Sequence, residues 1–313
     1  MAEQLQAIQR RIKSIESTEK IASAMQLVAA AKLKQATNRF NYSRNHLKPL
    51  ADMLKERIER ENFDKDPSYY TNKKTVIDDN KEIAPSLTIV ITGCKGMCGS
   101  YNSTILKELE DAEAMTTFLP LGLKGYDHIR SHNLFLLEDY IVDISPEDQD
   151  STDSNNETSI RSRFRDYYEK PAEEHSYSHI LNLSKKIIYR QQAGEIAEVH
   201  LVYAKYKNSM AYEVVSKMVL PVYNVDEKPE YTPYLAEFLA LTLYGAIGEA
   251  ALNEYGARRL AMKNATDNAE EILAGLETKY HRARQAQITD ELIEIISGTE
   301  SQQALEKEAK KKR

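Results

Sequence analysis

A narrow apolar stripe in a long segment without glycine or proline constrains the fold of this chain most strongly. Residues 4–36 contain neither of these helix breakers, and apolar side chains recur there at steps of three and four. The row consists of Leu5, Ile8, Ile12, Ile15, Ala22, Met25, Val28 or Ala29, and Ala36. A stripe this narrow is typical of a coiled-coil seam, not of the broad buried face of a globular helix. The partner of this helix is therefore expected to be another helix.

The N-terminal helix is predicted to cover residues 1–60. From residue 3 to residue 60 it would be a rod of roughly 85 Å, since an α-helix rises 1.5 Å per residue. Pro49 lies inside this range. Because proline lacks the backbone donor and clashes with the preceding turn, we expect a bend near residues 45–50.

The C-terminal part, residues 232–298, repeats the helical pattern. Thr232 before Pro233 is a start signal, and Gly298 is the predicted stop. Its apolar row is Ile272, Leu276, Tyr280, Ala283, Ile288, Leu292 and Ile295. Ten acidic residues stand here against six basic ones, whereas residues 1–48 hold nine Lys and Arg against three Glu. The opposite charges favour pairing of the two rods with each other.

Residues 85–225 show short apolar runs alternating with amphipathic segments. Strands are predicted at 87–92, 116–122, 197–206 and 211–222, and helices at 101–114, 123–133 and 179–195. This alternation indicates an α/β fold, a three-layer, Rossmann-like domain with a largely parallel sheet, whose last two strands form a hairpin. The acidic stretch 145–159 is predicted to be a disordered loop, and 299–313 a solvated tail.

Composition excludes several classes of protein. With 313 residues, 42% of them hydrophobic, the chain can bury a proper core. We find no run of about 18 apolar residues and no secretory signal, so a cytoplasm-like compartment is expected. Cys94 and Cys98 alone make neither a disulfide framework nor a zinc site, and we interpret them as partly buried thiols.

The strongest candidate for a ligand site is the stretch TGCKGMCGS that follows the strand at 87–92. Its glycines could cradle a phosphate at a helix N-terminus, but their spacing of three matches neither the dinucleotide fingerprint nor the P-loop, and a tight structural turn explains them as well. His128 and His132 stand four residues apart, and a surface pair of this kind is ordinarily without a metal. We therefore predict no catalytic site, no cofactor and no metal in this chain.

Three blocks of the sequence carry a family resemblance. Residues 10–36, 87–105 and 257–298 closely resemble, in this order, the signature regions of the gamma subunit of F-type ATP synthases. The resemblance is dense at both ends of the chain and looser in the middle. Long blocks in a fixed order are a specific signal.

The resemblance implies a rotor function. In that family the two terminal helices form an antiparallel coiled coil inside a hexamer of three alpha and three beta subunits. The α/β domain, together with the epsilon subunit, stands on the membrane ring of c subunits. The expected role is therefore to transmit rotation between c ring and hexamer, coupling the movement of protons or other ions to ATP synthesis or hydrolysis. The expected location is peripheral, on the cytoplasmic side of a bacterial cell membrane.

The resemblance also points to coupling residues. Met25 matches the methionine near the lever of the catalytic beta subunit. Arg284, Gln285 and Thr289 match polar positions that contact a loop of the beta subunit, and Glu291 and Glu294 lie on the same segment. Each could also be an ordinary exposed residue of the coiled coil.

Two other interpretations explain part of the pattern. A free-standing nucleotide-binding protein with a helical dimerisation arm accounts for the sheet and the seam, but not for the C-terminal block. A coiled-coil scaffold accounts for the rods and predicts a stable homodimer. The chain also departs from the family at Cys94, where an acidic residue is more usual, and in its longer C-terminal end.

Overall fold

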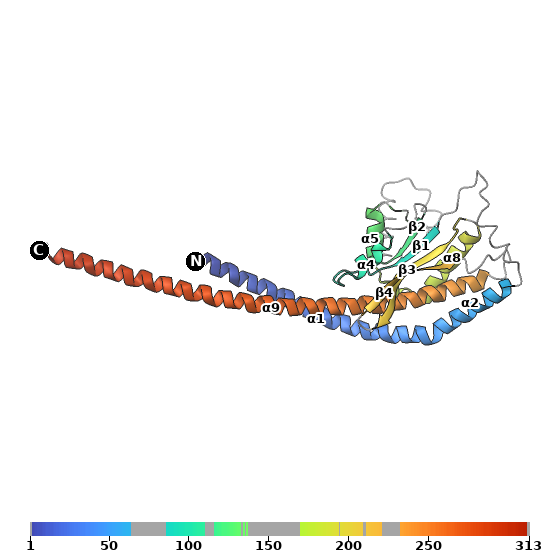
Figure 1. Ribbon diagram of the computed structural model, residues 1–313, viewed down its shortest axis with the longest axis horizontal. Coiled ribbons are helices and arrows are strands. Elements are labelled where there is room, and N and C mark those ends of the chain that lie inside the picture. The colour runs from blue at the N-terminus through green and yellow to red at the C-terminus, as the bar shows by residue number, and fades with distance from the viewer. Residues whose placement is uncertain are drawn as a thin grey trace. The chain divides into compact units, whose positions relative to one another are not determined.

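The computed structural model describes residues 2–63, 86–109, 116–132, 134, 136, 170–193, 195–208, 211–220 and 232–311. Two compact units can be distinguished (Figure 1). The helix-pair unit comprises Met1–Val28 and Leu260–Arg313, and the base unit comprises Ala29–Arg259. The predicted loop at 145–159 lies outside the described residues.

The N-terminal helix α1 runs from Ala2 to Tyr42 and follows the predicted seam. Four buried residues are spaced by seven, namely Ala22, Ala29, Ala36 and then Ser43 just beyond its end, and Phe40 is buried one turn after Ala36. Of the two alternatives at this position of the row, Ala29 is 1% exposed and Val28 is 59% exposed, so Ala29 belongs to the seam. A repeat of seven is the spacing expected for a helix packed lengthwise on another helix.

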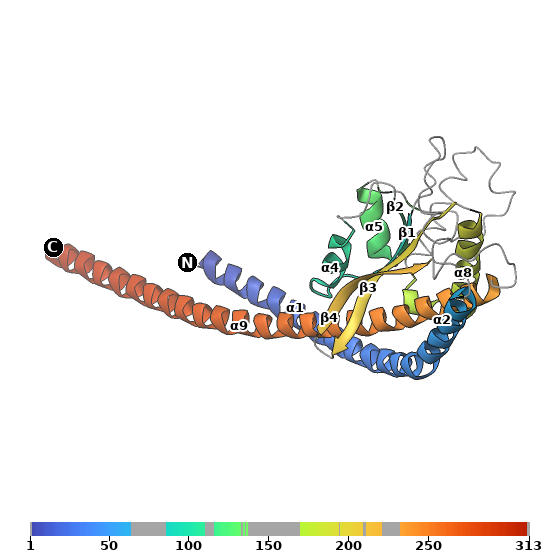
Figure 2. The same ribbon diagram turned by 45° about the vertical axis from the view of Figure 1, so that its right-hand side comes forward.

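The expected bend at Pro49 takes the form of a short π-helix. Ser43–Leu47 (η1) is π-helical, and the N–H of Lys48 donates to the carbonyl of Ser43, five residues back. The α-helix α2, Lys48–Phe63, follows directly. A π-bulge widens the turn before Pro49, whose ring cannot fit the regular α-helical ladder, and the chain bends there (Figure 2).

Within the described residues the sheet has four strands in the order β2-β1-β3-β4. The strands are β1 (Ser86–Ile91), β2 (Thr116–Leu121), β3 (Val199–Asn208) and β4 (Ala211–Leu220). β1 pairs in parallel with β2 and β3, and β3 pairs antiparallel with β4. The predicted largely parallel sheet with a final hairpin is confirmed.

Helices cover both faces of this sheet (Figure 1). Side chains of β1 alternate between the faces, so Val90 packs with α4 (Tyr101–Lys107) and α5 (Leu123–Ser131). Leu87, Ile89 and Ile91 pack on the other face with α8 (Tyr177–Gln192) and the first part of α9. The predicted three-layer α/β architecture is thus confirmed.

The C-terminal helix α9 runs without interruption from Thr232 to Lys311. The start at Thr232 agrees with the prediction, but the predicted stop at Gly298 is wrong, because the helix continues to Lys311. Gly298 costs about 1 kcal/mol in a helix interior, and the Gln, Ala, Leu, Glu and Lys residues after it are good helix formers. The glycine is therefore tolerated within the helix.

One stretch of α9 is long and apolar enough by composition to cross a membrane, which the sequence analysis did not anticipate. Of this window, 72% is buried inside the protein. The buried apolar residues of α9 between Leu235 and Ala250 belong to the main core, on one face of the sheet. A helix that is apolar on all sides is expected where the core surrounds it.

In the helix-pair unit, α1 and α9 lie side by side, and α9 continues past the N-terminal end of α1 (Figures 1 and 2). Met262, Ala269 and Leu276, again spaced by seven, are buried. Ile272, predicted for this row, is 46% exposed because the row passes through its neighbour Leu273 instead. From Ile288 to Glu300 every residue is exposed.

Candidate functional site

The predicted coupling residues all lie in the helix-pair unit, on two helices. Met25 is half-buried on α1, next to the seam residue Ala22. The other five predicted residues lie on α9, and their side chains are all exposed: Arg284, Gln285, Thr289, Glu291 and Glu294. Residues 284–294 make about three helical turns, so the five polar side chains point in several directions around the helix.

The α9 residues divide into faces by their spacing. Gln285 and Thr289 are four apart, and the Thr289 hydroxyl donates to the Gln285 carbonyl at 2.9 Å. Arg284 and Glu291 are seven residues apart and therefore lie on one face, next to the face of Gln285 and Thr289. Glu291 accepts a hydrogen bond from the Gln287 amide at 2.8 Å. The structure therefore places Gln285 and Thr289 on one face of α9 and Arg284 and Glu291 on another.

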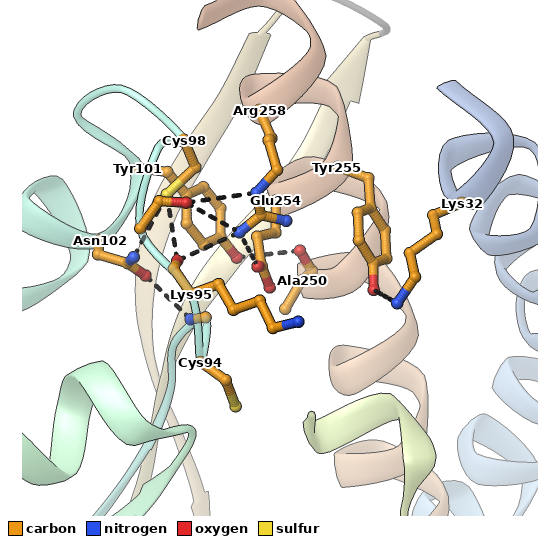
Figure 3. A network of polar contacts seen from close by, with 12 residues as sticks. Lys32, Cys94, Lys95, Cys98, Tyr101, Asn102, Ala250, Glu254, Tyr255 and Arg258 are labelled. Carbon is orange, nitrogen blue, oxygen red and sulfur yellow. Dashed lines mark hydrogen bonds and ion pairs between the residues drawn. The ribbon is translucent and has the colours of Figure 1, made fainter. Parts of the chain in front are cut away.

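A second polar cluster, which the sequence analysis missed, lies in the base unit (Figure 3). Arg258 Nη2 contacts Glu254 Oε1 at 2.5 Å, one turn away on α9, and the two side chains are 9% and 12% exposed. The same guanidinium donates to the carbonyls of Lys95 and Gly96 at 3.2 and 3.4 Å. Arg258 thereby ties α9 to the loop that follows β1.

Burial sets the electrostatics of this ion pair. Burial raises the pKa of the Glu254 carboxyl, and the nearby Arg258 opposes that shift. A buried carboxylate needs a close cation and further hydrogen bonds to stay ionised. In the sequence, the one sign of this pair is that Glu254 and Arg258 stand four residues apart within an apolar stretch.

The loop Gly93–Gly99 is a structural turn and not a phosphate cradle. A Cβ on Gly93 would lie 2.8 Å from the Glu254 carboxylate, and the Gly93 N–H already donates to Asn102 Oδ1 at 2.9 Å. The Glu254 side chain therefore fills the space beside Gly93, and the Gly93 N–H is already used. Of the two interpretations of TGCKGMCGS, the geometry supports the tight turn.

Both cysteines of this loop are buried thiols, as expected. Burial raises the pKa of the Cys94 thiol to about 11, and its Sγ donates to the Lys170 carbonyl at 3.5 Å. Burial also raises the pKa of Cys98. The two side chains point in different directions (Figure 3). Thiols of this kind are poor nucleophiles, because the thiolate is the reactive form.

Comparison with known proteins identifies the family. A profile described as ATP synthase matches residues 4–301. The sodium-ion-specific ATP synthase gamma chain of Acetobacterium woodii is 31% identical, with 96% of this chain and 99% of the relative covered. The ATP synthase gamma chain of Rickettsia bellii is 30% identical over 95% of this chain and 99% of its own length. The chain belongs to the ATP synthase gamma-chain family.

Solved structures agree in fold. A chain of the Euglena gracilis mitochondrial ATP synthase, from the assembly of its F1 part and c ring, has a TM-score of 0.61 at 14% identity, covering 97% of this chain and 96% of that chain. A rotor chain from the same organism has a TM-score of 0.56 at 13% identity, covering 92% and 100%. Both show the long terminal helices and central domain to be a known architecture.

Membership in this family confirms the identity expected from the three sequence blocks. The chain is the gamma subunit of an ATP synthase, a membrane-associated complex. The interpretations as a free-standing nucleotide-binding protein or a generic scaffold are no longer needed.

Proposed function

We propose that the chain works as the asymmetric shaft of its ATP synthase. The helix-pair unit enters the ring of three alpha and three beta subunits, while the base unit and an epsilon subunit bear on the c ring. Rotation at the c ring is thereby carried to the catalytic sites on the beta subunits, or in the reverse direction when ATP is hydrolysed. The complex lies on the cytoplasmic side of the membrane.

The exposed end of α9 carries this proposal. Ile288, Leu292, Ile293, Ile295 and Ile296 are 46–63% exposed on a helix that extends beyond the N-terminal end of α1. Large apolar side chains gathered on an exposed surface are typical of an interaction site. At about 100° per residue these side chains lie on one broad face of the helix, and a subunit of the surrounding ring packed along this face would cover them.

Asymmetry gives the shaft its effect on catalysis. A single pair of helices cannot present the same face to three beta subunits, so each catalytic site is biased toward a different conformation and a different nucleotide affinity. Moving a two-state site from 1:99 to 99:1 needs about 5.5 kcal/mol of differential interaction. A few polar and packing contacts along the shaft are sufficient for this.

Met25, Arg284, Gln285, Thr289, Glu291 and Glu294 are the proposed contacts to the beta subunits. The exposure of the five α9 side chains supports the proposal, since their polar groups are accessible to a partner. Loss of one polar contact is worth about 1 kcal/mol. A Gln285→Ala variant is therefore expected to change the hydrolysis rate about fivefold if the contact is made in the rate-limiting state.

Co-expression with the alpha and beta subunits of the same organism, followed by native mass spectrometry, tests the proposal. We expect one copy of this chain with three of each partner, and ATPase activity that is lost when this chain is omitted. Gln191→Ala is the matched control for Gln285→Ala, because Gln191 lies on α8 of the base unit and is none of the proposed contacts. A chain that fails to assemble and instead forms a homodimer or binds nucleotide would contradict the rotor function.

A further inference from the structure

The two shaft helices meet a third segment within the base unit. This segment, residues 170–176, contains the 3₁₀ turn η3, Ala172–Glu174, and leads into α8. Arg39 on α1 donates from Nη1 to the backbone carbonyl of Glu173. Tyr255 on α9 donates from its hydroxyl to the Glu173 carboxylate at 2.5 Å. One residue outside the shaft thus holds both of its helices.

A third bond connects the two helices at the same level. Lys32 Nζ on α1 donates to the Tyr255 hydroxyl at 3.3 Å and lies 5.4 Å from the centre of its ring (Figure 3). Tyr255 is 8% exposed, so these polar groups meet beside the core cluster that includes Ala36 and Phe40. The contacts run from α1 through Tyr255 of α9 to Glu173.

The 170–176 segment is itself fixed to the α/β domain. The Lys170 carbonyl accepts from the Cys94 thiol at 3.5 Å. Ala172 is buried in the main core, and His175 is buried with its ring stacked on His179 at 5.0 Å. The Ser176 hydroxyl accepts from the His179 N–H and caps α8. Force applied at Glu173 therefore reaches the sheet through several independent contacts.

The two helices need such a contact where the residues between them are small. Where α1 ends, the facing residues are small: Ser43 lies against Gly245, and a Cβ there would be 3.4 Å from the Ser43 hydroxyl. Small apolar side chains pack closely but do little to set the register of two helices, whereas a directional polar contact does. We propose that Glu173 is a positioning residue that holds α1 and α9 in register with the α/β domain, so that torque passes between domain and shaft without slippage. This role rests on the proposed rotor function.

Single-molecule rotation of the assembled complex tests the proposal. The ring of alpha and beta subunits is immobilised and rotation is stalled. The angular fluctuation of a probe attached to the α/β domain is then recorded. Angular variance varies inversely with stiffness. We assume that the Tyr255 and Arg39 contacts of Glu173 contribute equally to the torsional stiffness. Glu173→Ala removes the Tyr255 contact, which halves this stiffness and about doubles the angular variance that these contacts control. Glu173→Gln keeps an acceptor oxygen for Tyr255, so the variance should return most of the way toward wild type.

Two further variants separate this role from a merely structural one. Tyr255→Phe removes this hydrogen bond, together with the one from Lys32, without altering the 170–176 segment, so it should raise the variance by at least the same factor. The exposed neighbour variant Glu174→Ala should leave it unchanged. A loss of thermal stability in Glu173→Ala and Tyr255→Phe with variance equal to wild type would overturn the proposal. Failure of the wild-type complex to assemble or rotate would instead refute the proposed function.

Discussion

Removing Arg258 tests whether the base unit depends on a desolvated ion pair. The Arg258–Glu254 contact is 2.5 Å long, and both side chains are about one-tenth exposed. Breaking a buried pair by removing one partner costs about 3–5 kcal/mol, because the remaining charge is left uncompensated. Since some water still reaches this pair, we expect Arg258→Met to cost about 3 kcal/mol. Converted at 2–4 °C per kcal/mol, the melting temperature should fall by about 6–12 °C.

The double variant makes the prediction specific. Replacing both charges, as in Glu254→Leu with Arg258→Met, removes the unpaired charge and should cost clearly less than the two single changes together. Circular dichroism is the suitable probe, because the chain has no tryptophan. Arg190→Met is the matched control, since its pair with Glu195 is 3.4 Å long with side chains 32% and 56% exposed, and such a pair contributes about 0–1 kcal/mol.

Additive costs in this cycle would refute the reasoning. If Arg258→Met lowered stability by no more than the Arg190 control, the pair would be solvated and its close approach to the Lys95 and Gly96 carbonyls would contribute nothing. If the double variant cost the sum of the single ones, the two charges would act independently.

Four other perturbations have defined outcomes. Gly122→Ala should cost about 3 kcal/mol or more in chemical denaturation, because φ is +127° and the new Cβ would lie 2.2 Å from the Thr92 carbonyl oxygen; a fully stable variant would contradict this backbone. Burial, His179 and Lys170 lower the pKa of His175 from 6.5 to about 4, so the unfolded state binds more protons as the pH falls below 6.5. Stability should then drop by about 1–2 kcal/mol by about pH 5, and His175→Gln should flatten that slope in thermal melts; an unchanged slope would exclude His175 as its source. Met25→Lys should reduce ions pumped per ATP in vesicles while hydrolysis persists, and normal pumping would remove Met25 from the coupling surface. Truncation after residue 300 should leave ATPase activity intact, and a strong loss would assign a function to the end of α9.

Much of the architecture could be predicted from periodicity, because periodicity reports local geometry. The repeat of seven in Ala22, Ala29 and Ala36 follows from packing one helix along another, whatever the partner. The four strands were recognisable as short apolar runs between amphipathic segments, and their observed ends lie within a few residues of the predicted ones. Pro49 marked the bend for a covalent reason, since its ring excludes a regular helical turn.

Boundaries that depend on weak preferences could not be predicted in the same way. Gly298 was predicted to end the helix, but α9 continues to Lys311. The residues after Gly298 are good helix formers, and they offset the free-energy cost of one glycine in the helix. Ile272 and Leu273 are both apolar neighbours, and only the packing of the helix pair shows that the seam passes through Leu273.

The sequence by itself determined the family, the two long helices and the α/β order between them, since each is expressed in local pattern or in long blocks of residues. Only the tertiary structure showed that Glu173 joins α1 to α9, that Glu254 and Arg258 are buried together, and that Gly93 leaves room for a carboxylate. Glu173 stands 134 residues from Arg39 and 82 from Tyr255 in the chain. The role of a polar residue depends on the groups that it contacts in the folded chain. Sequence periodicity describes local structure only and does not predict contacts between residues so far apart.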